Sequence, residues 1–414
     1  MLIGVLAACS TGSTPGGASR QRPATSAAAT SRTAPELAPV RRNGATYRVP
    51  SPLPPGRPGD LLAASDLGPD PLIAGARRWL VLYHSRDVHD RDTAVSGVVL
   101  LPAAPVPRGG WPVVSWGHGT TGVADRCAPS QTPRLYYNEY AQEAATLVRA
   151  GYAVVATDFG GLGTPGPHGY LVGADEGNAM VDMVTAARHL SPALSTTWFA
   201  VGHSQGGQAA LFATRAAARA PGLHLAGTVA IAPASSLELL LPAVLSGGDP
   251  SDLTYGLYSL IGLSTVDPQV KVADLLGPLG RTRLPAVLDG ECLEETDKAL
   301  SGQPTAQIFQ SPVPDALVSE LSAELRQYGD PDTSATVGPV LVVQGSDDQD
   351  VPAGLTDAMV KRLQALGSDV TQRVYPGLDH DRVIGPSACD VLAWLAQHGG
   401  PAPPSCTPYP TDLS

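Results

Sequence analysis

The stretch that decides the fold is residues 197–207, which read TWFAVGHSQGG. Thr197–Val201 has the β-branched and aromatic residues of a buried strand, and the alanine-rich segment Ser204–Ala218 has the character of a helix. Between them stands Gly202-His203-Ser204-Gln205-Gly206, the one Gly-x-Ser-x-Gly match in the chain. A serine on a tight turn from strand to helix has its hydroxyl lifted above the sheet. We therefore predict that Ser204 is a nucleophile, with a glycine-rich turn capped by serine as the alternative.

A catalytic serine needs a base, and the base needs a carboxylate that fixes its tautomer. When the nucleophile stands on such a turn, the acid follows it in the chain and the histidine comes last. Residues 344–352 read QGSDDQDVP, and Asp348 stands three residues after Gly345 and just before Val-Pro. This spacing predicts Asp348 as the acid, with Asp347 and Asp350 as competing carboxylates.

The base is expected in the loop after the next strand. Residues 375–381 read YPGLDHD, and His380 is the only histidine of that loop. We predict His380 as the base that takes the proton of the nucleophile. The histidines upstream, His84, His89, His168, His189 and His224, have no comparable position and are expected to be ordinary structural residues.

Acyl transfer also needs donors for the developing oxyanion. Residues 115–122 read SWGHGTTG and follow a predicted strand. The backbone N–H groups of Thr120 and Gln205 are the predicted oxyanion hole, with Thr121 as the alternative to Thr120. His118 is expected to be a hydrogen-bonded anchor of this loop.

Short apolar runs alternate with helical patterns on both sides of the nucleophile turn. Strands are predicted over 79–84, 94–101, 112–116, 152–156, 197–201, 229–232, 339–343 and 370–374, and helices over 138–150, 176–190, 204–218, 357–366 and 383–397. This alternation is typical of a mostly parallel sheet with helices on both faces. We therefore predict an α/β core of residues 46–234 and 336–414, interrupted by a large helical cap insertion of residues 235–335.

Charge narrows the function classes. The chain has 414 residues, a formal net charge of −11 and no basic tract, which excludes a nucleic-acid-binding protein. The chain contains no run of about eighteen apolar residues, so its sequence predicts no membrane-spanning helix. The predicted cap holds fifteen Asp and Glu against five Lys and Arg, a net charge of −10. Such a surface repels anionic ligands, so neutral esters are favoured over acyl-CoA or anionic phospholipids.

The N-terminus predicts export. Residues 1–8 form a short apolar stretch before Cys9, and Leu6-Ala7-Ala8-Cys9 resembles a bacterial lipobox in which the cysteine is lipid-modified. Residues 9–45 are rich in Ser, Thr, Pro and Ala without apolar periodicity, which predicts a disordered tether. We expect a cell-envelope lipoprotein anchored to the membrane through Cys9. The alternative is a chance Ala-Ala-Cys, because no Lys or Arg precedes the apolar stretch.

Four further cysteines indicate two disulfides in an exported protein. They are Cys127, Cys292, Cys389 and Cys406, and the sequence leaves three pairings open. We favour Cys127–Cys292 and Cys389–Cys406, the second of which closes a short loop onto the tail. No cysteine or histidine cluster suggests a metal site.

Four motifs in order carry a family resemblance: residues 116–122 (WGHGTTG), 127–130 (CAPS), 158–163 (DFGGLG) and 202–206 (GHSQG). Together they resemble the secretory-lipase family of the yeast lipase A type, within the α/β-hydrolases, from about Pro71 to the end of the chain. The resemblance implies an α/β-hydrolase with a large helical cap, activity on acylglycerols and simpler esters, and no cofactor. It also implies the pairing Cys127–Cys292.

We therefore expect a serine hydrolase, a lipase or carboxylesterase, that acts on neutral esters or acylglycerols through an acyl-enzyme, without an obligate protein partner. Three alternatives stay open: an exported peptidase of the same fold, an acyltransferase that passes the acyl group to an acceptor other than water, and a non-catalytic lipid-binding lipoprotein.

Overall fold

The computed structural model describes residues 47–245 and 252–410. The predicted lipid-attachment residue Cys9 and the tether of residues 9–45 lie outside the described residues, so both stay predictions.

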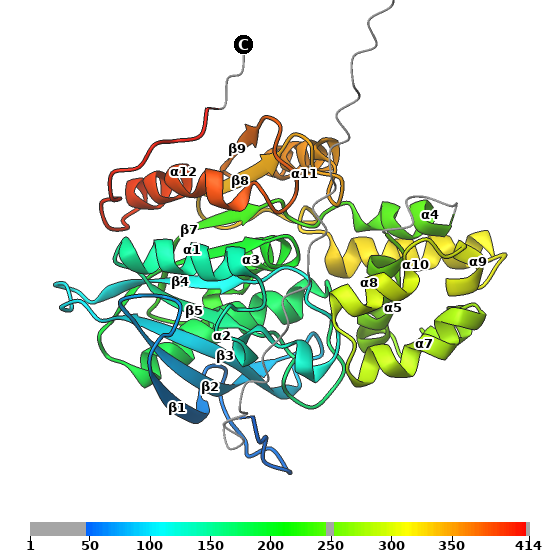
Figure 1. The fold of residues 1–414 in the computed structure, drawn as a ribbon, viewed down its shortest axis with the longest axis horizontal. Helices are drawn as coiled ribbons and strands as arrows, with labels where there is room; N and C mark the ends of the chain where they lie inside the picture. Colours follow the sequence, from blue (N-terminus) through cyan, green and yellow to red (C-terminus); the bar gives the residue numbers. More distant parts are fainter. Residues whose placement is uncertain (1–46, 246–251, 411–414) are drawn as a thin grey trace, which may run out of the picture. The chain divides into compact units, whose positions relative to one another are not determined.

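A nine-stranded sheet forms the centre of the fold, with the strand order β1-β2-β3-β5-β4-β6-β7-β8-β9. The strands are β1 (Leu61–Pro69), β2 (Ala76–Arg86), β3 (Asp92–Pro102), β4 (Trp111–Gly117), β5 (Ala153–Thr157), β6 (Leu194–His203), β7 (His224–Ile231), β8 (Val340–Gly345) and β9 (Val370–Tyr375). Strands β1 to β3 pair antiparallel, β3 pairs antiparallel with β5, and the strands from β5 to β9 are parallel. The predicted, mostly parallel sheet is confirmed (Figure 1).

Strand β1 was not predicted from the sequence. It lies at the edge of the sheet and most of its residues are half-buried or exposed, so it carries no clear apolar alternation. Edge strands often lack the pattern of a buried strand because one side of the strand has no neighbour.

Helices cover both faces of the sheet, as the alternating residues of β6 illustrate. Phe199 and Val201 share a core cluster with residues of α1 (Asn138–Arg149) and α12 (Ile384–Gln397). Trp198 and Ala200 share the opposite cluster with residues of α2 (Gly173–Leu190) and α3 (Gln205–Ala216). Because neighbouring residues of a strand point to opposite faces, the two clusters are the two sides of one sheet. Helix α11 (Ala353–Ala365) joins the side of α3 through contacts with β8 and β9.

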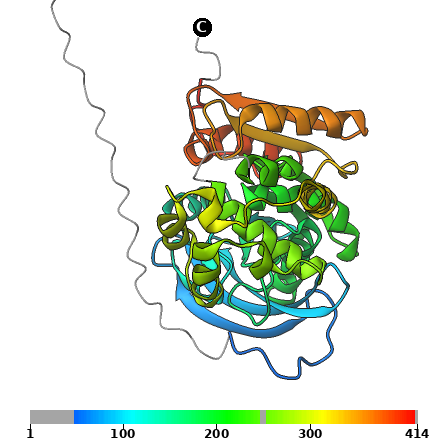
Figure 2. The same ribbon diagram turned by 90° about the vertical axis from the view of Figure 1, so that its right-hand side faces the viewer.

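The segment between β7 and β8 is helical in its described part. It contains η4 (Leu237–Leu239), α4 (Leu240–Leu245), α5 (Asp252–Val266), α6 (Val272–Leu275), α7 (Pro278–Asp289), α8 (Leu293–Leu300), α9 (Thr305–Ile308) and α10 (Asp315–Gly329). These helices have their own apolar core, in which Leu257, Tyr258 and Phe309 are almost fully buried. Figure 2 shows them in front of the strands when that side of the molecule faces the reader. Within the described residues, no helix is long and apolar enough to cross a membrane.

Two disulfides join the four cysteines in the pairing that we favoured from the sequence. Cys127–Cys292 links the loop after β4 to the start of α8, and Cys389–Cys406 links α12 to the C-terminal tail. Backbone contacts support the first link, because Gly122 and Cys292 form an isolated β-bridge and the Leu293 N–H donates to the Thr121 carbonyl at 2.9 Å. The helical segment is therefore fastened directly to the loop that carries Thr120, one of the two predicted oxyanion donors.

We expect the two disulfides to differ in their contribution to stability. Cys127 and Cys292 are 165 residues apart in sequence, and Cys389 and Cys406 are 17 apart. By loop-closure entropy the longer loop contributes about 5 kcal/mol to the free energy of unfolding and the shorter about 3 kcal/mol. Urea unfolding of the two paired serine variants, each compared with the wild type, measures this difference. A larger loss for the Cys389–Cys406 variant would contradict the expectation.

Candidate active site

Ser204 lies on a strained turn between β6 and α3. Its backbone angles are φ 56° and ψ −119°, a region that non-glycine residues rarely adopt and that costs roughly 1–3 kcal/mol. The turn is held in place because the Ser204 N–H donates to the Ile231 carbonyl of β7 at 2.9 Å. Strain of this kind is maintained where the surrounding structure fixes a residue in a functional position.

The two glycines of the Gly-x-Ser-x-Gly motif allow this turn because a side chain at either position would clash with the backbone. A Cβ at Gly202 would lie 2.1 Å from the carbonyl oxygen of Gly206, and one at Gly206 would lie 2.0 Å from the carbonyl oxygen of Gly117. Both contacts are with backbone atoms, which cannot give way as a flexible side chain can. Gly119 is close as well, because its Cβ would lie 3.3 Å from the Ser204 Cβ. The loop after β4 therefore packs directly against the nucleophile turn.

Asp348 is buried in the loop after β8, and both of its oxygens are hydrogen-bonded. Oδ1 accepts the backbone N–H groups of Asp350 and Val351 at 3.0 and 2.8 Å, and Oδ2 accepts the Gln344 side-chain amide at 2.8 Å. The same Oδ2 lies 2.8 Å from Nδ1 of His380. These bonds fix the carboxylate against the ring, as a carboxylate that orients a histidine requires.

His380 is buried in the loop after β9, with 7% of its surface exposed. Burial lowers the pKa of its imidazole, but the hydrogen bond and charge of Asp348, with the charges of Asp350 and Asp381, outweigh burial, so the pKa is raised above 6.5. Because Nδ1–H donates to Asp348, Nε2 carries the lone pair. In the part of the chain that is described, no hydrogen bond joins this ring to the Ser204 hydroxyl; such catalytic contacts often tighten only when the substrate binds.

The two competing carboxylates lie differently. Asp347 is exposed and accepts the neighbouring Ser346 hydroxyl at 2.7 Å. Asp350 is also exposed, but it lines the same pocket as Ser204. In the described structure Asp348 is the carboxylate hydrogen-bonded to His380.

The predicted oxyanion residues come from the start of α3 and from the loop after β4. Gln205 is the first residue of α3, and the first amides of a helix have no carbonyl acceptor within the helix. Thr120 lines the pocket together with Ser204, and its carbonyl accepts the Tyr137 hydroxyl at 3.2 Å. The alternative, Thr121, is fully buried and is not part of that pocket lining. His118 is buried and hydrogen-bonded through Nδ1 to the Gly119 carbonyl at 2.7 Å, which confirms it as a loop anchor.

The side chain of Gln205 is held by two residues that sequence reasoning missed. Its amide donates to Oε1 of Glu176 at 2.7 Å and to Nε2 of His168 at 3.0 Å. Burial lowers the pKa of His168 to about 4, so its ring is neutral at pH 7, and burial raises the pKa of Glu176 well above its usual value. The sequence does hold one signal, because Glu176 stands four and seven residues before Met180 and Met183 on the apolar face of α2.

Ser204 opens into a cavity of about 210 Å³ between the sheet and the helical segment. Its walls are mainly apolar and include Leu237, Leu240 and Leu355. Tyr170 and Thr120 add a polar edge, where their hydroxyl groups lie 2.8 Å apart. A concave apolar site with a few polar groups at the nucleophile is typical of a site for a small organic ligand.

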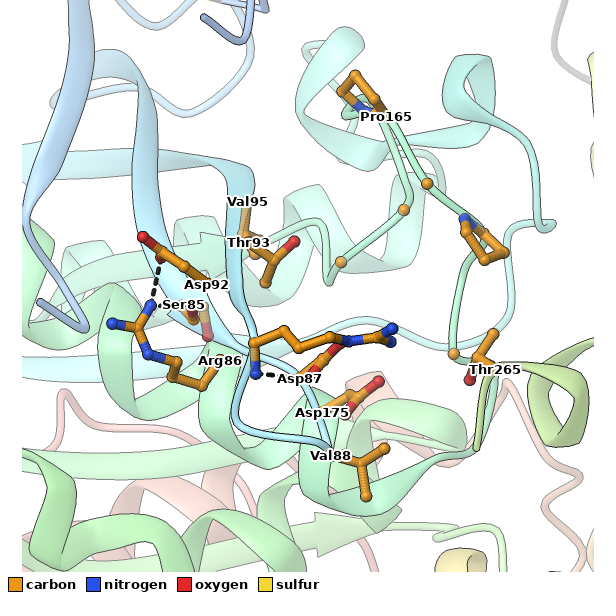
Figure 3. Close-up of a pocket in the computed structure, with 16 residues that line it drawn as sticks. Ser85, Arg86, Asp87, Val88, Asp92, Thr93, Val95, Pro165, Asp175 and Thr265 are labelled. Carbon is orange, nitrogen blue, oxygen red and sulfur yellow. Dashed lines mark hydrogen bonds and ion pairs between the residues drawn. The ribbon is translucent and has the colours of Figure 1, made fainter. Parts of the chain in front are cut away.

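A second cavity, of about 280 Å³, lies between the β2–β3 turn, the loop after β5 and Thr265 at the end of α5 (Figure 3). Four of its charged side chains form two ion pairs, Arg86 with Asp92 and Arg91 with Asp87. None of the predicted triad or oxyanion residues lines it.

Comparison with known proteins supports the fold. The family model described as "Serine aminopeptidase, S33" matches residues 135–385, which include Ser204, Asp348 and His380. Candida antarctica lipase A superposes with a TM-score of 0.72 at 21% identity, covering 88% of both chains. The rice cell wall degrading esterase LipA from Xanthomonas oryzae has a TM-score of 0.67 at 22% identity, covering 81% of this chain and 95% of the other. No curated protein sequence matches the chain.

A further structural relative is a putative hydrolase from Legionella pneumophila, with a TM-score of 0.69, 20% identity and coverage of 82% of this chain and 98% of the other. At such identities the structural likeness establishes the fold, and the resemblance to the secretory lipases is confirmed at that level. The family match extends over more than half of the chain. The chain therefore has the α/β-hydrolase fold and belongs to the serine aminopeptidase S33 family.

Proposed function

We propose that this protein is a serine hydrolase that cleaves neutral carboxylic esters through an acyl-enzyme on Ser204. Two observations carry the proposal. Asp348 and His380 form a hydrogen-bonded pair, and Ser204 is a strained serine that opens into an apolar cavity whose lining includes Asp350 and Val351, from the loop that carries Asp348. An oriented histidine and a serine on a strained turn are the groups that nucleophilic catalysis requires, which supports the proposal.

The mechanism follows from the proton positions. His380 Nε2 accepts the proton of the Ser204 hydroxyl as the oxygen attacks the ester carbonyl. The backbone amides of Thr120 and Gln205 stabilise the oxyanion, and Asp348 stabilises the imidazolium that forms. The imidazolium then protonates the leaving alcohol, and a water activated by His380 hydrolyses the acyl-enzyme.

The surroundings of the cavity favour a neutral ester. Residues 235–335, which we propose as the cap over a core of residues 46–234 and 336–414, carry a net charge of −10. An anionic substrate would approach against this field. The apolar walls contributed by Leu237 and Leu240 instead suit an acyl chain, which must leave water before attack.

We expect a preference for short acyl chains. The cavity of about 210 Å³ is smaller than the roughly 300–1,000 Å³ of sites for drug-sized ligands. Among p-nitrophenyl esters, kcat/KM for butanoate and hexanoate should exceed that for hexadecanoate by about tenfold or more. Steady-state kinetics with acyl chains of increasing length measures this, and absence of turnover with every ester would refute the proposed function.

A matched pair of leucine variants ties the preference to the cavity. Leu240→Ala removes wall atoms and should shift the optimum towards longer chains. Leu288→Ala truncates a leucine on α7 that is 45% exposed and lies outside the cavity lining, so the profile should stay unchanged. An identical profile for both variants would show that the chain binds elsewhere.

A second candidate is hydrolysis of aminoacyl amides, which the family description and one carboxylate favour. Asp350 lines the same cavity as Ser204 and could pair with the free amine of such a substrate. Comparing alanine p-nitroanilide with p-nitrophenyl butanoate separates the candidates. If the amide is the better substrate, and Asp350→Asn abolishes that advantage while sparing the ester, the peptidase function replaces the esterase function.

We also propose an extracytoplasmic location. In most organisms disulfides persist only in an oxidising compartment. The two disulfides of this protein therefore support export. Lipid modification of Cys9 would add a membrane anchor. Mass spectrometry of the protein from its native membrane fraction, with and without Cys9→Ser, tests the anchor.

A further inference from the structure

Two buried side chains connect the loop after β4 that carries Thr120, here called the oxyanion loop, to the proposed base His380. The mechanism above does not use them. Tyr140 comes from the first turn of α1, and His203 immediately precedes the nucleophile. Each is 2% exposed. The two rings pack in series against the base, with centroid distances of 5.8 Å between Tyr140 and His203 and 4.7 Å between His203 and His380.

Three hydrogen bonds run in one line through these residues. The Gly119 N–H donates to the Tyr140 hydroxyl oxygen at 2.9 Å. The Tyr140 hydroxyl lies 3.0 Å from Nδ1 of His203. Nε2 of His203 lies 3.0 Å from the backbone carbonyl oxygen of His380. The line thus begins one residue before the proposed oxyanion donor Thr120 and ends on the main chain of the base.

Chemistry fixes the direction of every bond. A carbonyl oxygen only accepts, so Nε2 of His203 carries the hydrogen. Burial, together with the charge of His380, lowers the pKa of His203 to about 4, so at pH 7 the ring has a single N–H and Nδ1 must accept. The Tyr140 hydroxyl therefore donates to Nδ1 and accepts from Gly119. Each group has one possible role, and no polar group of the line is left over.

The line also explains why Gly119 is glycine. A Cβ there would lie 2.3 Å from the Tyr140 hydroxyl and 3.2 Å from Nδ1 of His203. A side chain at this position would push both groups away from the loop. The close approach of the loop to the two rings therefore depends on the absence of a Cβ.

We propose that Tyr140 and His203 are positioning residues that set the oxyanion loop and the main chain of His380 at a fixed distance from each other. The inference rests on the proposed function, since it names residues that act through the oxyanion hole and the base. The tetrahedral intermediate needs both at once: its oxyanion lies at the loop, and the proton that it released lies on His380. A displacement of either by a fraction of an ångström weakens stabilisation of the transition state more than binding of the ester.

A double-mutant cycle tests the coupling. Tyr140→Phe removes the hydroxyl, and His203→Phe keeps a ring against His380 but removes both nitrogens. We expect each variant to lower kcat for p-nitrophenyl butanoate by about tenfold or more while KM stays within about twofold. Because the two changes break the same line, the double variant should be no more than about threefold slower than the slower single variant. Independent effects would multiply to about a hundredfold.

Controls separate positioning from folding. Tyr152→Phe makes the same change at a buried tyrosine of the core whose hydroxyl has no hydrogen-bond partner among the described residues, and kcat should stay unchanged. His203→Gln, whose amide N–H can take the place of Nε2, should restore much of the kcat lost in His203→Phe. Titration with a fluorophosphonate counts folded active sites, so kcat is expressed per reactive serine.

The outcomes are distinct from those that test the function. A wild-type protein as slow as Ser204→Ala overturns the proposed function. A wild-type protein that turns over, together with a multiplicative cycle or with losses in KM alone, overturns the positioning role. An equal loss of kcat in Tyr140→Phe and Tyr152→Phe would assign the effect to the stability of the core.

Discussion

Replacing Ser204 by alanine is expected to lower kcat/KM for p-nitrophenyl butanoate by a factor on the order of 10⁵ or more. The alanine has no oxygen to form the acyl-enzyme, and the remaining turnover comes from binding and the oxyanion hole alone. The fold should be retained, because the backbone strain at φ 56° is the same for alanine as for serine. The backbone N–H of residue 204 also still donates to the Ile231 carbonyl. Ester kinetics and thermal unfolding together measure the result.

A matched serine provides the control for this variant. Ser264 lies at the end of α5, where its hydroxyl donates to the Ile261 carbonyl at 2.6 Å. Ser264→Ala should leave kcat/KM within about twofold, since the residue lies outside the cavity that contains Ser204. Retained turnover in Ser204→Ala, with a folded protein, would show that another group attacks the ester.

Asp348→Asn should be the next most damaging change, with a loss of kcat of about 10⁴-fold. The carboxylate accepts the Nδ1–H of His380 at 2.8 Å, and an amide that presents its N–H there would favour the tautomer whose Nε2 cannot accept a proton. The neighbouring acids serve as controls. Asp347→Asn and Asp350→Asn should each retain ester turnover to within about fivefold, because neither is hydrogen-bonded to the ring in the described structure.

Asp348→Asn should also change the pH dependence of kcat/KM. The base must be neutral to accept a proton, so kcat/KM falls as the pH drops through the pKa of His380. That pKa is raised above 6.5, chiefly because the hydrogen bond and charge of Asp348 overcome burial. With asparagine at 348, the main cause that raises this pKa is lost while burial remains, so the acid limb should move to lower pH. A shift to higher pH, or a loss confined to Asp350→Asn, would assign the orienting role to another acid.

Local sequence patterns predict much of the fold and the residues of the candidate triad. The strand before Ser204, the glycines around it and the spacing from Gly345 to Asp348 are written within a few residues each, so the sequence alone predicts them. The structure brings Asp348 to within 2.8 Å of His380, 32 residues further along the chain. The order of the predicted strands and helices likewise follows from apolar periodicity, whereas the half-exposed edge strand β1 lacks that pattern.

What the sequence did not predict is what depends on packing between distant elements. Tyr140 looks like one more apolar position on the face of α1, and its hydroxyl gains a meaning only where α1 meets the nucleophile turn 63 residues later. Glu176 reaches Gln205 in the same way, from α2 to α3. A neutral, buried histidine such as His203 has no sequence signature, because its state is set by the groups that surround it.

Covalent labelling tests the central claim most directly. A fluorophosphonate reacts with an activated serine, and peptide mass spectrometry of the labelled protein locates the adduct. We predict a single adduct on the peptide that contains Ser204, formed in the wild type and lost in Ser204→Ala. An adduct on a different residue, or a folded wild-type protein that takes up no label while hydrolysing esters, would contradict the account.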